Sequence, residues 1–92
     1  MPVWKLSAVA DRKRIAKHIA LDNPTAAIEI VDLLIKTAKM LDTNPKLFKA
    51  GRMKGTREAV AHPNYVLVYQ VSADTVTILR MLHTSQNWPV EE

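Results

Sequence analysis

The amino-acid sequence predicts an α+β domain in which two helices pack on one face of an antiparallel sheet. The first half contains two long segments whose apolar residues recur at helical spacing. The last third contains three runs rich in Val, Ile, Leu, Tyr and Thr, separated by the turn sequences Pro-Asn and Ser-Ala-Asp. We expect the 92 residues to form one domain, residues 1–92, with an N-terminal strand, a two-helix hairpin and a C-terminal three-stranded meander.

The composition is typical of a folded protein, with 48% apolar and 24% charged residues. There is no cysteine, which excludes disulfides, a thiolate nucleophile and a cysteine-based zinc site and is typical of a reducing compartment. The three histidines are scattered along the sequence, so we expect no metal site, and no cofactor motif is present. No segment resembles a signal peptide or a membrane span, so we expect a cytoplasmic protein without a membrane partner.

The N-terminal segment 3–6 is short and mostly apolar, which predicts an edge or joining strand. Ser7 follows at the position of a helix N-cap and predicts a first helix over residues 8–21. Basic residues cover most of the circumference of this helix, so only a narrow face is expected to be buried. That face contains Ala8, Asp11, Ile15 and Ile19.

The second helix is expected over residues 24–41, because Asn23 is a good N-cap and Pro24 is tolerated in the first turn. Its apolar stripe predicts packing against both the first helix and the sheet. The stripe contains Ala27, Val31, Leu34, Ala38 and Leu41. Strands are predicted at residues 57–61, 65–71 and 75–82, and alternation places Tyr65 and Tyr69 in the core.

A basic segment leads into the meander. Residues 43–57 contain no acidic residue, and the net charge of the chain is +4. The bases of this segment are Lys46, Lys49, Arg52, Lys54 and Arg57. Such charge predicts binding to an anionic partner, either nucleic acid or an acidic protein, although it is also compatible with a merely basic surface. With only five aromatic residues in the chain, a base-stacking platform is poorly supported.

His83 is the sharpest candidate for chemistry, because it follows an apolar strand and precedes polar residues. Its imidazole is suited to moving a proton, or else to holding the strand end through a backbone hydrogen bond. Arg80 interrupts the same strand, and strict alternation places it on the side of Ile78 and opposite to His83. A joint Arg80 and His83 phosphate site therefore requires a bulge or twist, and a structural ion pair is the alternative for Arg80. His62 precedes Pro63 and is expected in an exposed loop.

The order of these segments resembles the RelE/ParE superfamily of bacterial toxins. The helix hairpin is followed by G-T-R-E-A-V at 55–60, H-P-N-Y-V-L-V-Y-Q-V at 62–71 and L-R-M-L-H-T-S-Q-N-W-P at 79–89. The resemblance covers nearly the whole chain. The helix start N-P-T-A-A at 23–27 and the terminal L-H-T-S are more similar to the ParE branch.

This resemblance implies the toxin of a type II toxin–antitoxin, or plasmid stabilisation, module. Such toxins arrest growth, are held inactive by a cognate antitoxin, and affect operator DNA only through that antitoxin. ParE-like members poison DNA gyrase by binding. RelE-like members are mRNA interferases, which cut messenger RNA on the ribosome with basic and His or Tyr side chains.

A nuclease of this superfamily is expected to use His83, Arg80, Arg57 and Lys54 of this chain. The match to the nuclease pattern is incomplete, however. Glu58 and Val60 stand where RelE has lysines, and Asn64 stands where another nuclease branch has a catalytic Asp. We therefore expect a ParE-like gyrase inhibitor that is not an enzyme, with a ribosome-dependent mRNA endonuclease as the alternative and a non-toxic interaction module as the remaining possibility.

Overall fold

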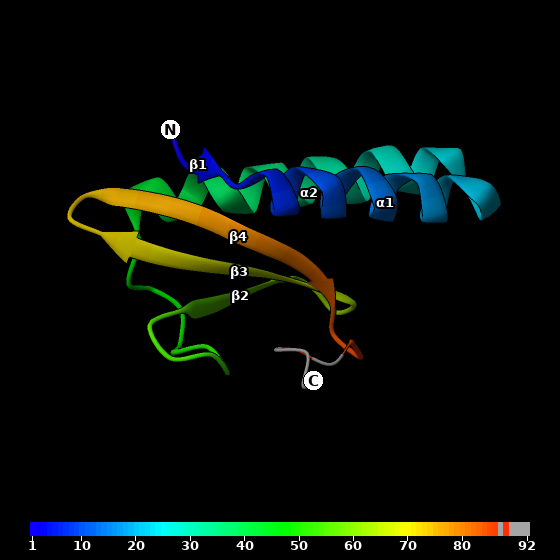
Figure 1. Ribbon diagram of the computed structural model, residues 1–92. Coiled ribbons are helices and arrows are strands. Elements are labelled where there is room, and N and C mark those ends of the chain that lie inside the picture. The colour runs from blue at the N-terminus through cyan, green and yellow to red at the C-terminus, as the bar shows by residue number, and fades with distance from the viewer. Residues whose placement is uncertain (87, 89–92) are drawn as a thin grey trace.

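A computed structural model of the chain describes residues 1–86 and 88. The elements follow in the order β1 (Val3–Trp4), α1 (Leu6–Asp22), α2 (Pro24–Thr43), β2 (Arg57–His62), β3 (Tyr65–Ser72) and β4 (Thr75–His83). The two helices lie side by side along one face of the sheet, and the α2–β2 loop lies toward its other side (Figure 1). This arrangement confirms the predicted α+β class, the helix hairpin and the C-terminal meander.

The four strands form one sheet in the order β1-β4-β3-β2. The meander is antiparallel as expected, but β1 runs parallel to β4, with Val3 opposite Thr77 and Trp4 opposite Ile78. A parallel pair requires a long crossover connection, and the helix hairpin is part of that connection. No helix in residues 1–86 is long and apolar enough to cross a membrane.

The start of α1 differs from the prediction. The helix begins at Leu6, and its N-cap is Lys5, so the assignment of Ser7 as N-cap is wrong. The Ser7 hydroxyl instead donates a hydrogen bond to the carbonyl of Leu79 in β4, at 2.7 Å. Strand β1 ends at Trp4, so it does not reach the carbonyl of Leu79. The hydroxyl of Ser7, in the first turn of α1, satisfies this backbone acceptor in place of a longer strand.

The start of α2 agrees with the prediction. The side chain of Asn23 accepts a hydrogen bond from the backbone N–H of Ala26, at 3.1 Å, and Pro24 occupies the first turn. The helix continues two residues beyond the expected end at position 41, to Thr43. The capping chemistry was therefore readable from the sequence, whereas the end of the helix was less sharply marked.

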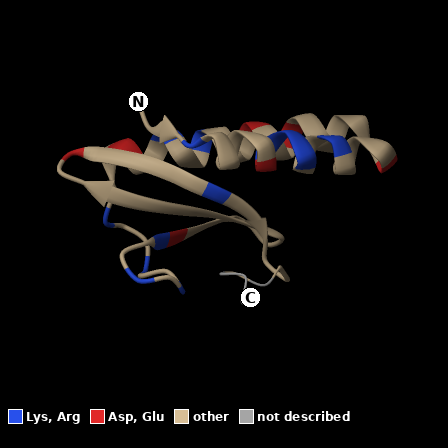
Figure 2. Ribbon diagram, in the orientation of Figure 1, with Lys and Arg blue, Asp and Glu red and all other residues tan. Residues whose placement is uncertain are grey.

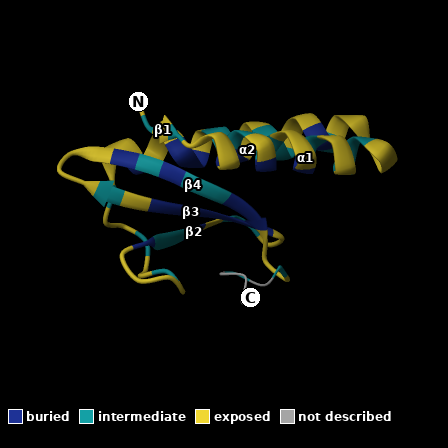
Figure 3. Ribbon diagram, viewed as in Figure 1, coloured by how far each residue is buried: buried dark blue, intermediate teal, exposed yellow. Residues whose placement is uncertain are grey.

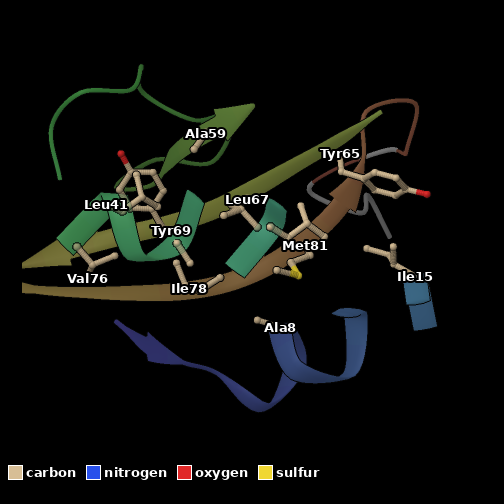
Figure 4. Packing of buried hydrophobic residues seen from close by; sticks show 12 residues of the cluster. Ala8, Ile15, Leu41, Ala59, Tyr65, Leu67, Tyr69, Val76, Ile78 and Met81 are labelled. Atoms are coloured by element: carbon tan, nitrogen blue, oxygen red, sulfur yellow. The ribbon is translucent and has the colours of Figure 1, made fainter. Parts of the chain in front are cut away.

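The main hydrophobic core lies between the helices and the sheet (Figures 3 and 4). Tyr69 is fully buried and Tyr65 is 7% exposed, which confirms their predicted place in the core. Its buried members from the helices are Ala8, Ile15, Leu34, Ala38 and Leu41, and those from the strands are Ala59, Tyr65, Leu67, Tyr69, Val76, Ile78 and Met81. A second, smaller cluster consists of Val66, Val68 and Leu82, with Leu79 and Trp88 packed against it.

A β-bulge in β4 changes which side chains share a face. Val68 pairs with Arg80, but its neighbour Tyr69 pairs with Ile78, so Leu79 is an extra residue. As a result Ile78 and Met81 both belong to the main core, although strict alternation would separate them. The predicted placement of Arg80 on the side of Ile78 is therefore wrong. The bulge lies before Arg80, and the pairing from Arg80 to His83 is regular, so these two residues still alternate to opposite sides of β4 as predicted.

Candidate functional site

Arg80 forms an ion pair with Asp11, which is only 2% exposed. Its Nε lies 2.6 Å from Oδ2 of the carboxylate, and its Nη2 lies 3.1 Å from Oδ1. The same carboxylate accepts a hydrogen bond from the backbone N–H of Met81, at 3.0 Å, and lies 3.1 Å from Nη2 of Arg14. Two arginines and a strand N–H thus explain how an acidic residue occupies the buried face of α1.

The positive charge of Arg80 is compensated within the fold by the carboxylate of Asp11. Its hydrogen bond to Asp11 raises the pKa of the guanidinium above its ordinary value, the nearby negative charge adds to this shift, and burial opposes it. The guanidinium also lies 5.2 Å from the centre of the Trp88 ring, which is the geometry of a cation–π contact. Arg80 therefore ties β4 to α1 and to the C-terminal segment.

His83 ends β4 with an exposed ring. Its Nδ1 accepts a hydrogen bond from the backbone N–H of Ser85, at 3.1 Å, and lies 2.7 Å from the Ser85 hydroxyl. The ring of Tyr65 meets His83 edge-on, with 5.4 Å between centroids. Since Nδ1 accepts, the neutral ring carries its proton on Nε2. The imidazole is held in one orientation, with a second nitrogen that can donate.

A pocket of about 310 Å³ opens beside His83. Its lining residues are Arg14, Ile15, His18, Tyr65, His83 and Gln86. Sequence reasoning missed Arg14 and His18, because both belong to α1 and only the tertiary structure brings them to the end of β4. The single local signal was their four-residue spacing on the basic side of the helix. An arginine, two histidines and a tyrosine together can hold an anion or transfer a proton.

The three histidines, scattered in sequence, lie close to this end of the sheet. The His62 ring lies 5.8 Å from that of Tyr65, and His18 lines the same pocket as His83. His62 is half-buried at the end of β2, and its Nδ1 accepts from the N–H of Asn64, so the expected exposed loop position is wrong. Within the described ranges 1–86 and 88, no three His, Asp or Glu side chains are arranged to hold a metal ion.

The two arginines of the basic segment, Arg52 and Arg57, have different hydrogen-bond partners. The Nε of Arg52 lies 3.2 Å from the Glu58 carboxylate, which also accepts the backbone N–H of Arg52 at 2.7 Å. Arg57 instead donates from Nη1 to the carbonyl of Phe48, at 2.7 Å, and more weakly to that of Lys46, at 3.5 Å. Bases concentrate on the loop before β2 (Figure 2). Glu58, which departs from the nuclease pattern, is thus the partner of Arg52.

Arg57 also lies near the buried hydroxyl of Tyr69, which donates a hydrogen bond to the carbonyl of Pro45, at 2.8 Å. Burial raises the pKa of Tyr69 above its ordinary value, and the charge of Arg57 opposes part of this shift. Lys46 and Arg57 line a second pocket, of about 470 Å³, next to the β3–β4 turn. The side chains of the remaining lysines, Lys49 and Lys54, are exposed and do not line it.

The four residues that a nuclease would use are not brought together. Arg57 pairs with Tyr69 and His83 pairs with Tyr65, so they are four residues apart along β3, which is about 13 Å. Arg80 does not line the His83 pocket, and Lys54 lies in the loop before β2. The structure instead groups His83 with residues of α1.

Comparison with known proteins extends over nearly the whole chain. The family model described as the ParE toxin of the type II toxin–antitoxin system parDE matches residues 3–88. The protein named "Putative toxin Y4kP" from Sinorhizobium fredii is 36% identical over 87 residues, which cover 94% of this chain and 90% of the relative.

Solved structures share the fold. A chain of a chromosomal ParDE toxin–antitoxin system from P. aeruginosa superposes with a TM-score of 0.76 and 23% identity, covering 90% of this chain and 95% of that one. The solution structure of the hypothetical protein HP0894 from Helicobacter pylori gives a TM-score of 0.57 and 24% identity, covering 91% and 93%.

Proposed function

This chain belongs to the ParE toxin family of type II toxin–antitoxin systems, and on that basis we propose that it arrests growth by binding and inhibiting DNA gyrase. The observation that favours binding over catalysis is the engagement of Arg80 with the buried Asp11. A guanidinium in that position cannot reach a substrate phosphate without withdrawing two charged hydrogen bonds from a buried carboxylate, which is costly.

The separation of the other candidates supports the same proposal. General acid–base catalysis requires its groups within hydrogen-bond reach of one reacting site. Arg57 and His83 stand about 13 Å apart along β3. Arg57 also binds loop carbonyls, and Glu58 places a negative charge in the same strand. This separation supports a toxin that acts by binding over an RNA-cleaving enzyme of the RelE type.

Neutralisation is proposed to come from a cognate antitoxin with an acidic segment. The basic segment offers it the residues Lys46, Lys49, Arg52, Lys54 and Arg57. Opposite charges steer association and set specificity. Contact with operator DNA is then indirect, through the antitoxin, and the toxin acts in the cytoplasm, where gyrase is found.

One observation favours the alternative, a ribosome-dependent mRNA endonuclease. His83, with its ring held by Ser85, shares a pocket with Tyr65, Arg14 and His18. A histidine beside an arginine is a suitable pair for proton transfer and for charge stabilisation at a phosphate. In this alternative Arg14 replaces Arg80 as the cationic group.

Substitution of His83 by alanine separates the two functions. The purified His83→Ala variant is compared with wild type for gyrase-mediated DNA cleavage and for ribosome-dependent transcript cleavage, with His62→Ala as the matched control. We expect the variant to keep its effect on gyrase. A nuclease would instead lose about 10²- to 10⁴-fold in transcript cleavage. Transcript cleavage by wild type that His83→Ala abolishes, with gyrase unaffected by either protein, would refute the proposal.

A further inference from the structure

We infer that the pocket shared by Lys46 and Arg57 binds the carboxylate of an acidic side chain from a partner protein. The pocket lies where the α2–β2 loop meets the end of β3 and the turn into β4. The inference rests on the proposed antitoxin contact and makes it specific, because it selects two of the five basic residues as the recognition point. It does not depend on gyrase as the target.

The charge within the pocket is uncompensated. Of the described residues that line it, only Lys46 and Arg57 are charged, and both are positive. No carboxylate in residues 1–86 lies within ion-pair distance of either side chain, whereas Arg52 and Arg80 each have one. A half-buried guanidinium whose partners are neutral carbonyls has no nearby negative charge to compensate its own, so it attracts an anion.

The guanidinium of Arg57 is preorganised. Its strand position pairs with Tyr69, and the carbonyl of Phe48 holds Nη1 at 2.7 Å. The Tyr69 hydroxyl fixes the same loop through Pro45. Both hydrogen bonds of Arg57 within the described chain come from Nη1, although a guanidinium has five N–H donors. The planar fork suits a carboxylate, and a fixed side chain loses little entropy when one binds.

Small residues form much of the wall of this pocket. Gly55 has a φ of 81°, in the left-handed region that favours glycine, and a Cβ there would meet no atom within 4 Å. Ala50 and Thr56 also line the pocket. A volume of about 470 Å³ exceeds that of one acidic side chain, so the backbone on either side of it fits as well.

The geometry favours an acidic peptide over nucleic acid. Affinity for nucleic acid grows with the number of phosphates that are contacted along the backbone. Here two cations line one open pocket, and no aromatic residue is among the described lining residues for a base to stack on. One carboxylate, held by one arginine and one lysine, matches this arrangement.

The test is a titration of the isotope-labelled full chain with the blocked peptide acetyl-Ala-Glu-Ala-amide, followed by ¹H–¹⁵N NMR. We expect saturable shifts of the Ala50, Gly55 and Thr56 amides, and none with the peptide that carries Gln in place of Glu. Lys46→Ala should weaken the apparent affinity by about three-fold, since an exposed charge pair contributes modestly. Lys49→Ala, an exposed lysine of the same loop outside the pocket, should not change it.

Three outcomes would overturn the inference. They are the absence of shifts at these amides, equal shifts with the Gln peptide, or saturation by a short single-stranded oligonucleotide at lower concentration than the Glu peptide. Arg57 is left unchanged because it holds the loop, so a folding defect cannot imitate a binding defect. Gyrase plays no part in this measurement, so a failure of the pocket and a failure of the proposed function are distinguishable.

Discussion

Arg80 in β4 and Arg57 in β2 are both half-buried arginines of one sheet, yet their surroundings differ in charge. Arg80 faces the buried carboxylate of Asp11, at 2.6 Å, and the ring of Trp88. Among the residues that the structure describes, Arg57 donates side-chain hydrogen bonds only to carbonyl oxygens of the loop before β2. The first charge is neutralised within the fold, whereas the second remains available to a partner. An arginine in a strand is therefore informative about function only once its partner is known.

The difference in charge around the two arginines has a local cause at each of them. On the side of β1, β4 has no neighbouring strand beyond Trp4, and Asp11 on α1 accepts hydrogen bonds there from the N–H of Met81 and the guanidinium of Arg80. The segment 43–57 contains no acidic residue, and the Glu58 carboxylate that follows it pairs with Arg52, so Arg57 is left with backbone carbonyls. The carboxylate beside Arg80 stabilises the fold, whereas the absence of a carboxylate beside Arg57 leaves a positively charged site.

The largest effect is expected for Asp11→Ala. The change leaves Arg80 without its anion and the Met81 N–H without an acceptor. Breaking such a buried pair should lower the free energy of unfolding by about 3 kcal/mol, at the lower end of the range because Arg80 is partly exposed. Urea denaturation measures this. Asp22→Ala, at the exposed end of α1, is the control and should stay within about 0.5 kcal/mol. A loss below about 1 kcal/mol for Asp11→Ala would contradict a structural role of the pair.

An intermediate effect is expected for Arg57→Ala. It removes a charged hydrogen bond to Phe48 but leaves behind only a neutral carbonyl group, not a buried charge. The free energy of unfolding should fall by about 1.5 kcal/mol, as is usual for hydrogen bonds with one charged partner. Lys54→Ala, an exposed base of the same segment, serves as control. If Arg57→Ala destabilised the protein as much as Asp11→Ala, the contrast between the two arginines would be lost.

The smallest effect is expected for Tyr69→Phe, which removes the hydrogen bond to Pro45 and should cost about 1 kcal/mol. Burial raises the pKa of Tyr69, so the folded state holds this proton more tightly than the unfolded state. The stability that the phenol contributes is fully present below its unfolded pKa of about 10 and is lost as the pH rises through the folded value.

Chemical denaturation of wild type and Tyr69→Phe on both sides of pH 10 measures this dependence. The stability difference between the two proteins should shrink at the higher pH. Tyr65→Phe is the control, because the Tyr65 hydroxyl makes no hydrogen bond with any residue of 1–86 or 88. A difference that stays constant with pH would show that the Arg57 charge cancels the effect of burial on the Tyr69 pKa, and one that grows with pH would show that the Arg57 charge dominates.

Much of the fold was predictable because it depends on short-range patterns. Alternating apolar residues located all three strands of the meander to within one residue at either end. The Asn23 cap and the following proline marked the start of α2. The prediction of Ser7 as a helix N-cap was wrong for a physical reason. Its hydroxyl donates to a carbonyl of β4, far away in the sequence, and does not accept from a backbone N–H of its own helix.

The candidate site was less predictable. His83 stood out from its sequence neighbours, but Arg14 and His18 reach the same pocket from α1. Strict alternation also failed after Leu79, because a bulge is a property of two paired strands and not of one. The basic segment was evident from composition, whereas the pairing of Arg52 with Glu58 was not.

The sequence by itself determined the helices, the strands, the basic loop and the family, because backbone periodicity and capping act over a few residues. Only the tertiary structure decided which charges are neutralised. The bond between Asp11 and Arg80 spans 69 residues, and it forms because α1 packs against the unpaired edge of β4. Arg57 has no such neighbour in the described chain, and this difference in packing separates an arginine that holds the fold together from one that can bind a partner.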